Sequence, residues 1–412
     1  MLNAYLEPDS RSAELWARAR EVMPGGNSRT TVFVAPHPAY AASAQGARVT
    51  DVEGQTRLDF VNNYTSLIHG HAHPRIIQAV VRQLGLGTAV SFPTEAEVRL
   101  AEVVVDRVAS LEHVRFTNSG TEAVMMAVQA ARAFTGRPRV ARFEGCYHGA
   151  YADHAEDDVI LPFNDAAATE RLIEQHAAEL AAVIVDPLPH RPGFVDPLDG
   201  FLQRLRQVTR QHGILLISDE IISFRVAHGG PQQRYGYAAD LTTLGKIIGG
   251  GFPVGAFGGR RDVMAVFDPT SKSSSRISHG GTFNANPVTM VAGYESMAML
   301  PPEEYDRLAT LGQRVRTGLS DLFETHGVTW QVAGQASLFK IHPHPRTVTD
   351  YRSSSLEPDE QLAMERFYQA MFAEGIILTP ELAGCVSTPM SEADVDSLVT
   401  AADRALAATG LA

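Results

Sequence analysis

The sequence contains few of the residues that indicate a secreted or membrane-bound protein. Of 412 residues only two are cysteines, Cys146 and Cys385, and they form neither a CxxC pair nor a Cys/His metal motif. A disulfide framework and a metal site are therefore not expected, and a cytoplasmic, reducing location is predicted. No apolar run approaches the length of a bilayer, and the first residues lack the basic and apolar segments of a signal peptide.

Positive charge is also scarce. The chain has 35 Lys and Arg against 47 Asp and Glu, which gives a formal net charge of -12, and no basic block could follow a phosphate backbone. The sequence therefore predicts no nucleic-acid partner and no membrane partner, and small molecules are the expected substrates. A hydrophobic fraction of 44% is typical of a globular protein with a large core.

From about residue 75 to 260, segments with the apolar spacing of strands alternate with segments that have the apolar spacing of helices. Short apolar runs are typical of buried strands, and amphipathic segments between them are typical of helices. This alternation predicts an α/β fold with a large, mostly parallel central sheet and helices on both faces. Helices are expected at 11–22, 75–84, 95–109, 121–134, 199–213 and 301–327, and strands at 47–54, 56–63, 114–116, 139–145, 181–187 and 213–220.

Ligands of parallel sheets bind at the carboxyl ends of the strands, so polar residues at these ends are candidates for a site. The stretch "TNSGTEA" places Ser119, Gly120 and Thr121 at the start of a helix. Free N–H groups and the helix dipole favour an anion there, commonly a phosphate. The alternative is a plain helix cap, because Ser119 and Glu122 also fit a capping box.

Three further strand ends carry candidates. In "EGCYHGAY", Tyr147 could stack on a planar ligand or simply pack on the core, and His148 follows it. Asp219 ends the apolar run "ILLISD" and needs a cation or a hydrogen-bond donor if it is buried. Lys246, in "DLTTLGKIIGGGFPVGAFGG", is either an amine nucleophile of lowered pKa or a lysine that extends into water. Glycines 249–251 are expected to leave room around it.

Taken together, these residues match the parts of a pyridoxal 5'-phosphate site. Lys246 would form the Schiff base, and Asp219 would keep the pyridine nitrogen protonated. The helix that begins near Gly120 would hold the phosphate. No metal is expected in this site.

The chain resembles the class III (fold-type I) pyridoxal-phosphate aminotransferases, a group that includes glutamate-1-semialdehyde aminomutase. The matching stretches run in order through nearly the whole chain: "MPGGNSR", "GHAHP", "RFTNSGTEA", "EGCYHG", "LISDEI", "DLTTLGKIIGGGFPVGAFGG" and "HGGTFNANP". The resemblance implies a fold-type I transferase with a smaller α+β domain built from both termini. We expect residues 1–50 to join the small domain, 51–298 to form the large cofactor-binding domain, and 299–412 to form the C-terminal small domain.

The resemblance also implies a role for individual residues. Lys246 is the Schiff-base lysine, and Thr282 reaches the phosphate of the neighbouring subunit's cofactor, which implies a homodimer with shared active sites. The expected cofactor-binding residues are Ser119, Gly120, Thr121, Tyr147, His148, Asp186, Asp219 and Thr282. The expected substrate-binding residues are Arg29, Tyr64 and Glu381.

Within the family, the stretches around Arg29 and Lys246 look closest to β-amino-acid (β-phenylalanine-type) aminotransferases. The arginine of those enzymes that matches Arg29 binds the substrate carboxylate, a task that suits a guanidinium. The alternative for Arg29 is an ion pair in a loop. Glu381 stands where the β-amino-acid enzymes carry an arginine, so it would repel an acidic group.

Other departures from the family pattern concern the pocket walls. Asp186 replaces the usual glutamate before Pro187, and His190 and Arg191 follow where the family has a Gln-Gly pair. The segment after "CYHG" is short, which is expected to leave the site more open.

The predicted reaction transfers an amino group from an amino acid or amine, with β-amino acids among the candidates, to a 2-oxo acid. Ping-pong kinetics are expected, with pyridoxamine 5'-phosphate between the half-reactions. The alternatives on the same scaffold are an aminomutase of the glutamate-1-semialdehyde type and an amino-acid racemase. The short segment weighs against the aminomutase, which must retain its released intermediate. A more remote alternative is a non-catalytic phosphate-ligand binder.

Overall fold

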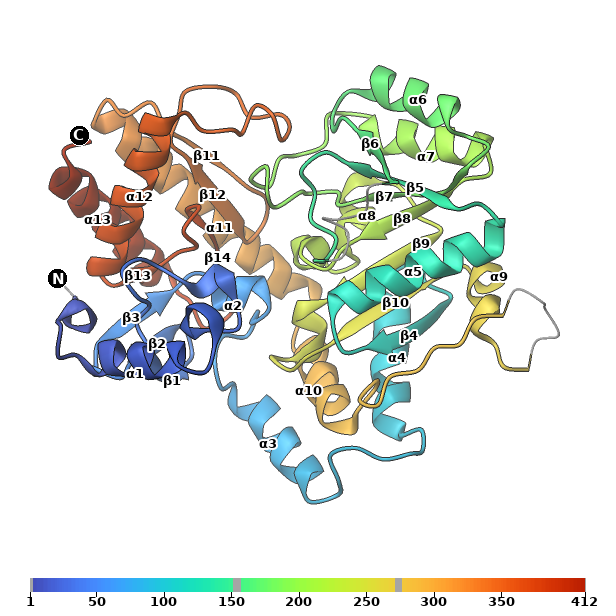
Figure 1. Ribbon diagram of the computed structural model, residues 1–412, viewed down its shortest axis with the longest axis horizontal. Coiled ribbons are helices and arrows are strands. Elements are labelled where there is room, and N and C mark those ends of the chain that lie inside the picture. The colour runs from blue at the N-terminus through green and yellow to red at the C-terminus, as the bar shows by residue number, and fades with distance from the viewer. Residues whose placement is uncertain (1–2, 151–156, 271–275, 412) are drawn as a thin grey trace.

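The computed structural model describes residues 3–150, 157–270 and 276–411, which form two lobes (Figure 1). The large lobe contains a seven-stranded sheet, and the small lobe contains both chain termini. The strands of the large sheet are β4 (His113–Thr117), β5 (Arg139–Phe143), β6 (Val159–Leu161), β7 (Leu180–Val185), β8 (Leu215–Asp219), β9 (Leu241–Gly245) and β10 (Gly255–Gly259).

The large sheet confirms the predicted, mostly parallel architecture. Its strand order is β4-β10-β9-β8-β7-β5-β6, and β10 is the strand that runs antiparallel to its two neighbours. The inner strand β7 is buried along its whole length, as its continuous apolar run predicts. Val183 and Val185 pack on one face of the sheet, whereas Ala182 and Ile184 pack on the other.

Helices cover both faces of this sheet. Helices α6 (Ala166–Gln175) and α7 (Phe201–Gln211) pack on one face, and α5 (Gly120–Thr135) with α9 (Arg261–Met264) packs on the other. The other helices of this lobe are α3 (Pro74–Leu84), α4 (Glu95–Arg107), α8 (Gly230–Tyr235) and α10 (Pro287–Ala298). None of the helices within the described residues has the length and apolar character needed to cross a membrane.

The small lobe combines the two ends of the chain, as predicted. In its first sheet, β13 (Ile376–Ile377) lies parallel to β3 (Thr56–Asp59), with Ile376 opposite Leu58. Strand β3 lies beyond residue 50, and the exact division of the chain into domains stays a prediction. The other strands and helices of this lobe are β1 (Ala41–Gln45), β2 (Arg48–Asp51), β11 (Gln331–Ala333), β12 (Leu338–His342), β14 (Ala383–Cys385), α1 (Arg11–Arg20), α11 (Pro302–Thr325), α12 (Pro358–Ala373) and α13 (Glu392–Thr409).

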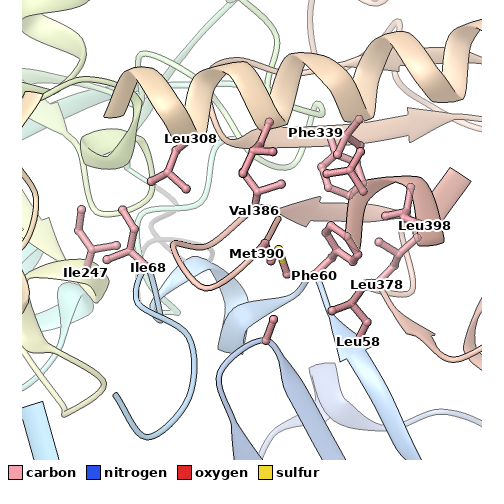
Figure 2. Packing of buried hydrophobic residues seen from close by; sticks show 14 of the residues in the cluster. Leu58, Phe60, Ile68, Ile247, Leu308, Phe339, Leu378, Val386, Met390 and Leu398 are labelled. Carbon is pink, nitrogen blue, oxygen red and sulfur yellow. The ribbon is translucent and has the colours of Figure 1, made fainter. Parts of the chain in front are cut away.

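A hydrophobic cluster joins the two lobes (Figure 2). Helix α11 lies above it in Figure 2 and contributes Leu308, and Ile68, Ile247 and Phe339 contribute side chains from three distant parts of the sequence. Ile247 is the residue next to Lys246, so the packing of this cluster fixes the backbone that carries the candidate lysine.

One predicted strand is too long at its C-terminal end. The strand expected at 56–63 stops at Asp59, whose Oδ1 accepts hydrogen bonds from the backbone N–H groups of Val61 (2.8 Å) and Asn62 (3.0 Å). The chain then enters a left-handed turn, Asn62–Thr65, labelled α2 in Figure 1. All four residues of this turn have positive φ angles, between 47° and 69°. Such backbone costs about 1–3 kcal/mol per residue and persists where its surroundings enforce it, commonly at functional sites.

The glycine tract that follows Lys246 is required by packing. Gly250 has a φ of +59°, and a Cβ at this position would lie 2.4 Å from the carbonyl oxygen of Ala292 in α10. At Gly249 a Cβ would lie 2.5 Å from Cγ1 of Val254. The turn therefore packs closely on α10 and on Val254, the residue before β10, and the chain returns as β10; the expected role of leaving room around the lysine stays a prediction.

Substitution of Gly250 should show this requirement. Gly136 ends α5 with a φ of +69°, and a Cβ there would have no atom within 4 Å, so it is a matched control. Gly136→Ala should lower the free energy of unfolding by about 1–2 kcal/mol, the cost of left-handed backbone. Gly250→Ala should lower it by more, because a clash with backbone is added. Urea denaturation measures both, and an equal loss in the two variants would contradict the packing argument.

Candidate active site

Lys246 lies at the carboxyl end of β9, where the strand passes into the short helix η6 (Lys246–Gly249). Its φ is +50°, and its Nζ donates a hydrogen bond to the carbonyl oxygen of Tyr64 at 2.9 Å. Burial lowers the pKa of Lys246 to about 8; the nearby Asp219 opposes this shift, and the charges of Arg29 and Arg225 add to it. An appreciable fraction of the free amine is therefore present near neutral pH, as a nucleophile or a base requires.

Asp219 ends the neighbouring strand β8 and is buried with donors around it, as expected. Its Oδ1 accepts a hydrogen bond from Thr243 Oγ1 (3.1 Å), and its Oδ2 lies 2.7 Å from Nδ1 of His148. Asp219 is the register partner of Thr243 in β9, three residues before Lys246. The two charged side chains thus end adjacent strands on the same edge of the sheet.

Two further acids are buried beside Asp219. Burial, with the charge of Asp219 adding to it, raises the pKa of Asp186 to about 8. The pKa of Glu220 is also raised to about 8, mainly by burial, although hydrogen bonds from Gln232 and Ser218 oppose the shift. Both acids are therefore mostly protonated at neutral pH.

The start of α5 forms the predicted helix cap and leaves N–H groups that are compatible with an anion site. Ser119 Oγ accepts a hydrogen bond from the N–H of Glu122 (3.2 Å), so the helix cap is real. The first N–H groups of a helix, here those of Gly120 and Thr121, have no partner within the helix and can still bind an anion. The loop carrying Gly149 lies against this end, because a Cβ at Gly149 would be 2.7 Å from Thr121 Oγ1. This loop brings Tyr147 and His148 to the helix start.

The left-handed turn brings Arg29 towards the lysine. The guanidinium of Arg29 lies 5.3 Å from the centre of the Tyr64 ring and donates to Asn63 Oδ1 at 2.9 Å. The Tyr64 hydroxyl donates to the carbonyl oxygen of Thr31. Among the described residues Arg29 makes no ion pair, so the alternative of a loop ion pair is not observed.

The remaining predicted residues lie at the edges of this region. Tyr147 is partly exposed, and the guanidinium of Arg191 lies 4.9 Å from the centre of its ring. Glu381 is exposed between β13 and β14, where its charge acts on Tyr64. Thr282 is exposed in a turn before α10. Most of the short segment after "CYHG" lies outside the described residues.

Sequence reasoning missed three residues near the lysine. Thr243 could have been found, because it lies opposite Asp219 when the ends of the two strands are aligned. Arg225, which is fully buried, and Lys340, a partly buried lysine on β12, carry no local signal. Each is brought to the site by contacts between segments that are distant in the sequence.

Comparison with known proteins identifies the family. The family model described as Aminotransferase class-III matches residues 32–155 and 151–387. The chain belongs to the class III aminotransferases. The resemblance read from the sequence is thereby confirmed, and with it the fold-type I architecture and the dependence on pyridoxal 5'-phosphate.

Relatives of this class III aminotransferase carry two kinds of name. A glutamate-1-semialdehyde 2,1-aminomutase from Methanothermobacter thermautotrophicus is 39% identical over 96% of this chain and 99% of its own. The crystal structure of an omega-transaminase from Sphaerobacter thermophilus matches with a TM-score of 0.96 and 53% identity, over 99% of this chain and 100% of the other. A β-phenylalanine aminotransferase from Variovorax paradoxus matches with a TM-score of 0.93 and 36% identity, over 99% and 97% of the two chains.

The residues of this chain fit the family's cofactor. A partly buried amine, a buried carboxylate that contacts His148 and the N-terminus of α5 lie at one edge of the sheet. Glycine at 149 keeps clear the space beside Thr121 that a side chain would occupy. The chain is therefore an enzyme, and the alternative of a non-catalytic binder is not retained.

Proposed function

We propose that this enzyme is an aminotransferase that moves an amino group from an amino acid, with β-amino acids as the donor class, to a 2-oxo acid. The observation that carries the proposal is the position of Arg29 beside Tyr64, the residue whose carbonyl oxygen accepts the Lys246 amine. A guanidinium there can hold a substrate carboxylate while the amino group of the substrate faces the lysine. The 53% identity to an omega-transaminase supports transfer between two substrates.

Each residue has a distinct task in this proposal. Pyridoxal phosphate, when bound, supplies an electron sink for the carbanion formed at the substrate carbon. Asp219 would pair with the ring nitrogen and is oriented for it by His148, whereas Gly120, Thr121 and the Ser119 backbone would hold the phosphate. Lys246 Nζ takes the proton from the substrate carbon that bears the amino group, because its lowered pKa makes it a base near neutral pH.

An intramolecular aminomutase is the second candidate, favoured by the 39% identity to glutamate-1-semialdehyde aminomutases. A racemase would use the same lysine. The requirement for an acceptor separates them: a transaminase releases an oxo product and needs a 2-oxo acid to turn over again, whereas an aminomutase or racemase turns over with one substrate.

A cytoplasmic location is part of the proposal, supported by two cysteines that are both buried and unpaired.

Removing the lysine amine should abolish turnover. In Lys246→Ala we expect kcat to fall by about 10⁴-fold or more, the upper end of what one acid–base group contributes. Borohydride reduction of the wild type, followed by peptide mass spectrometry, should find the cofactor adduct on Lys246, one of three lysines in the chain. Lys340→Met is the matched control and should be labelled as the wild type is. An adduct on another lysine, or multiple turnovers by Lys246→Ala, would overturn the assignment.

Arg29 should determine the use of carboxylate donors. Arg29→Ala should raise KM for β- and α-amino acids by about 10- to 100-fold, since a hydrogen bond to a charged group contributes about 1.5–3 kcal/mol. An amine without a carboxylate, such as 1-phenylethylamine, should be used equally by both proteins. The measurement is a screen of α-, β- and ω-amino donors against pyruvate and 2-oxoglutarate. Unchanged kinetics on every carboxylate donor would remove Arg29 from the site.

We also propose a homodimer with shared active sites. Helix α3 projects from the large lobe at the bottom of Figure 1, and its surface and the loop after it expose large apolar side chains. Leu86 and Phe92 are 80% and 81% exposed, and Phe283 beside Thr282 is 58% exposed. Apolar side chains exposed together in this way mark interfaces. A second copy seated on them would bring Thr282 to a neighbouring chain.

Charge placed on this surface should weaken the dimer. Phe92→Glu and Leu86→Glu should each raise the dimer dissociation constant at least about 10-fold, because a buried apolar side chain contributes about 1.5–3 kcal/mol. Leu198→Glu is the control, since Leu198 is also exposed but lies in the loop before α7, where it lines a pocket with Gln313 and Arg316 of α11. Sedimentation velocity over a concentration series provides the measurement. A monomeric wild-type holoenzyme would contradict the proposal.

A further inference from the structure

A second amine, that of Lys340, lies close to the catalytic region. Lysine is rare in this chain: three of its 35 basic residues are lysines, Lys246, Lys272 and Lys340. Lys340 belongs to β12 of the small lobe, and its Nζ donates a hydrogen bond to the carbonyl oxygen of Arg191 at 3.1 Å. An ammonium group has three N–H donors, so this bond leaves two for another acceptor.

The turn that contains His190 and Arg191 connects Lys340 to the catalytic lysine. A Cβ at Gly193 would lie 2.9 Å from Cδ of Lys340, so the turn packs directly on the lysine side chain. Burial is the main cause that lowers the pKa of His190 to about 3, and the charges of Lys340 and Lys246 both add to the shift. His190 is therefore close to both amines.

The other side of the turn faces the predicted cofactor region. The guanidinium of Arg191 lies over the ring of Tyr147, the residue expected to stack on the cofactor. Lys340 and Arg191 thus form a wall of cationic groups near Lys246, supplied by β12 and by the turn after β7, with His190, uncharged at neutral pH, beside them. Arg29 reaches Lys246 from a different segment, near the N-terminus.

Glu381 lies near this wall. The charge of Glu381 acts on Lys340 and also on Tyr64, so the carboxylate lies near both. Within the described residues no carboxylate approaches Lys340 Nζ to within 4.0 Å, so the ammonium is not neutralised by a direct ion pair. Lys340 therefore offers a positive charge to a ligand on this side of Lys246.

We propose that Lys340 is a specificity-determining residue that binds the distal carboxylate of a dicarboxylic 2-oxo acid, the acceptor in the second half-reaction. This inference rests on the proposed aminotransferase function and deepens it. On binding, Nζ keeps its hydrogen bond to the Arg191 carbonyl and donates to the carboxylate, while Arg191 lies alongside. Monocarboxylic acceptors such as pyruvate do not reach Lys340 and gain nothing from it.

Acceptor discrimination tests the proposal. Lys340→Met removes the charge and keeps the length of the side chain. It should raise KM for 2-oxoglutarate by about 10- to 100-fold, the contribution of a charged hydrogen bond, and leave KM for pyruvate within about twofold. Lys340→Arg keeps the charge and should retain most of the preference. Glu381→Gln should lower KM for 2-oxoglutarate, because it removes the opposing carboxylate.

A binding measurement provides a readout that does not depend on turnover. Calorimetric titration of the holoenzyme with glutarate, a dicarboxylate that cannot react, should show weaker binding in Lys340→Met by the same factor. Butyrate, which has one carboxylate, should bind both proteins equally. Melting temperatures of the holoenzymes show whether the variant is folded.

The outcomes separate this inference from the proposed function. If the wild type does not transfer the amino group of any donor to its cofactor, the aminotransferase proposal fails, and this inference with it. If the donor half-reaction proceeds but Lys340→Met loses activity equally on pyruvate and 2-oxoglutarate, Lys340 has a structural role and the inference alone is wrong. A wild type that uses pyruvate and rejects 2-oxoglutarate would also overturn it.

Discussion

A buried guanidinium holds together the segments that surround Lys246, the candidate Schiff-base lysine. Arg225 is 1% exposed and donates hydrogen bonds to the carbonyl oxygens of Thr65 (3.0 Å) and Val386 (2.5 Å). It thereby ties the large lobe to both the left-handed turn and the C-terminal part of the small lobe. Thr65 follows Tyr64, the acceptor of the Lys246 amine. Because these acceptors are neutral, the positive charge of Arg225 is not cancelled and contributes to the lowered pKa of Lys246.

Burial affects the charges of the acidic side chains in this site as much as their hydrogen-bond partners do. Asp186 and Glu220 are neutral acids at pH 7, whereas Asp219 has His148 and Thr243 as hydrogen-bond partners. The carboxylate at the end of β8 thus has polar partners, whereas the two acids beside it are kept neutral mainly by burial. A cluster of three ionised acids in this space would repel one another strongly and would raise the pKa of the lysine.

The sequence predicts the elements whose signals are local. Short apolar runs between helical segments locate β7 and β8. The position of polar residues at strand ends is enough to find Asp219 and Lys246. The left-handed turn escapes prediction, because the contacts that enforce it come from Cys385 and Arg225, far away in the chain. Buried arginines and lysines look like surface residues in a sequence, since only tertiary contacts distinguish them. The roles of Thr282 and Glu381 come from the family resemblance and stay predictions.

The pairing of β13 with β3 has a consequence for the order in which the protein assembles. The partner of Leu58 is Ile376, so the first sheet of the small lobe stays incomplete until almost the whole chain has left the ribosome. The large lobe has no such requirement, because the strands of its sheet lie between His113 and Gly259. During synthesis, the edge of β3 therefore has no partner until Ile376 has been made, and the pairing then closes a long loop at an entropic cost.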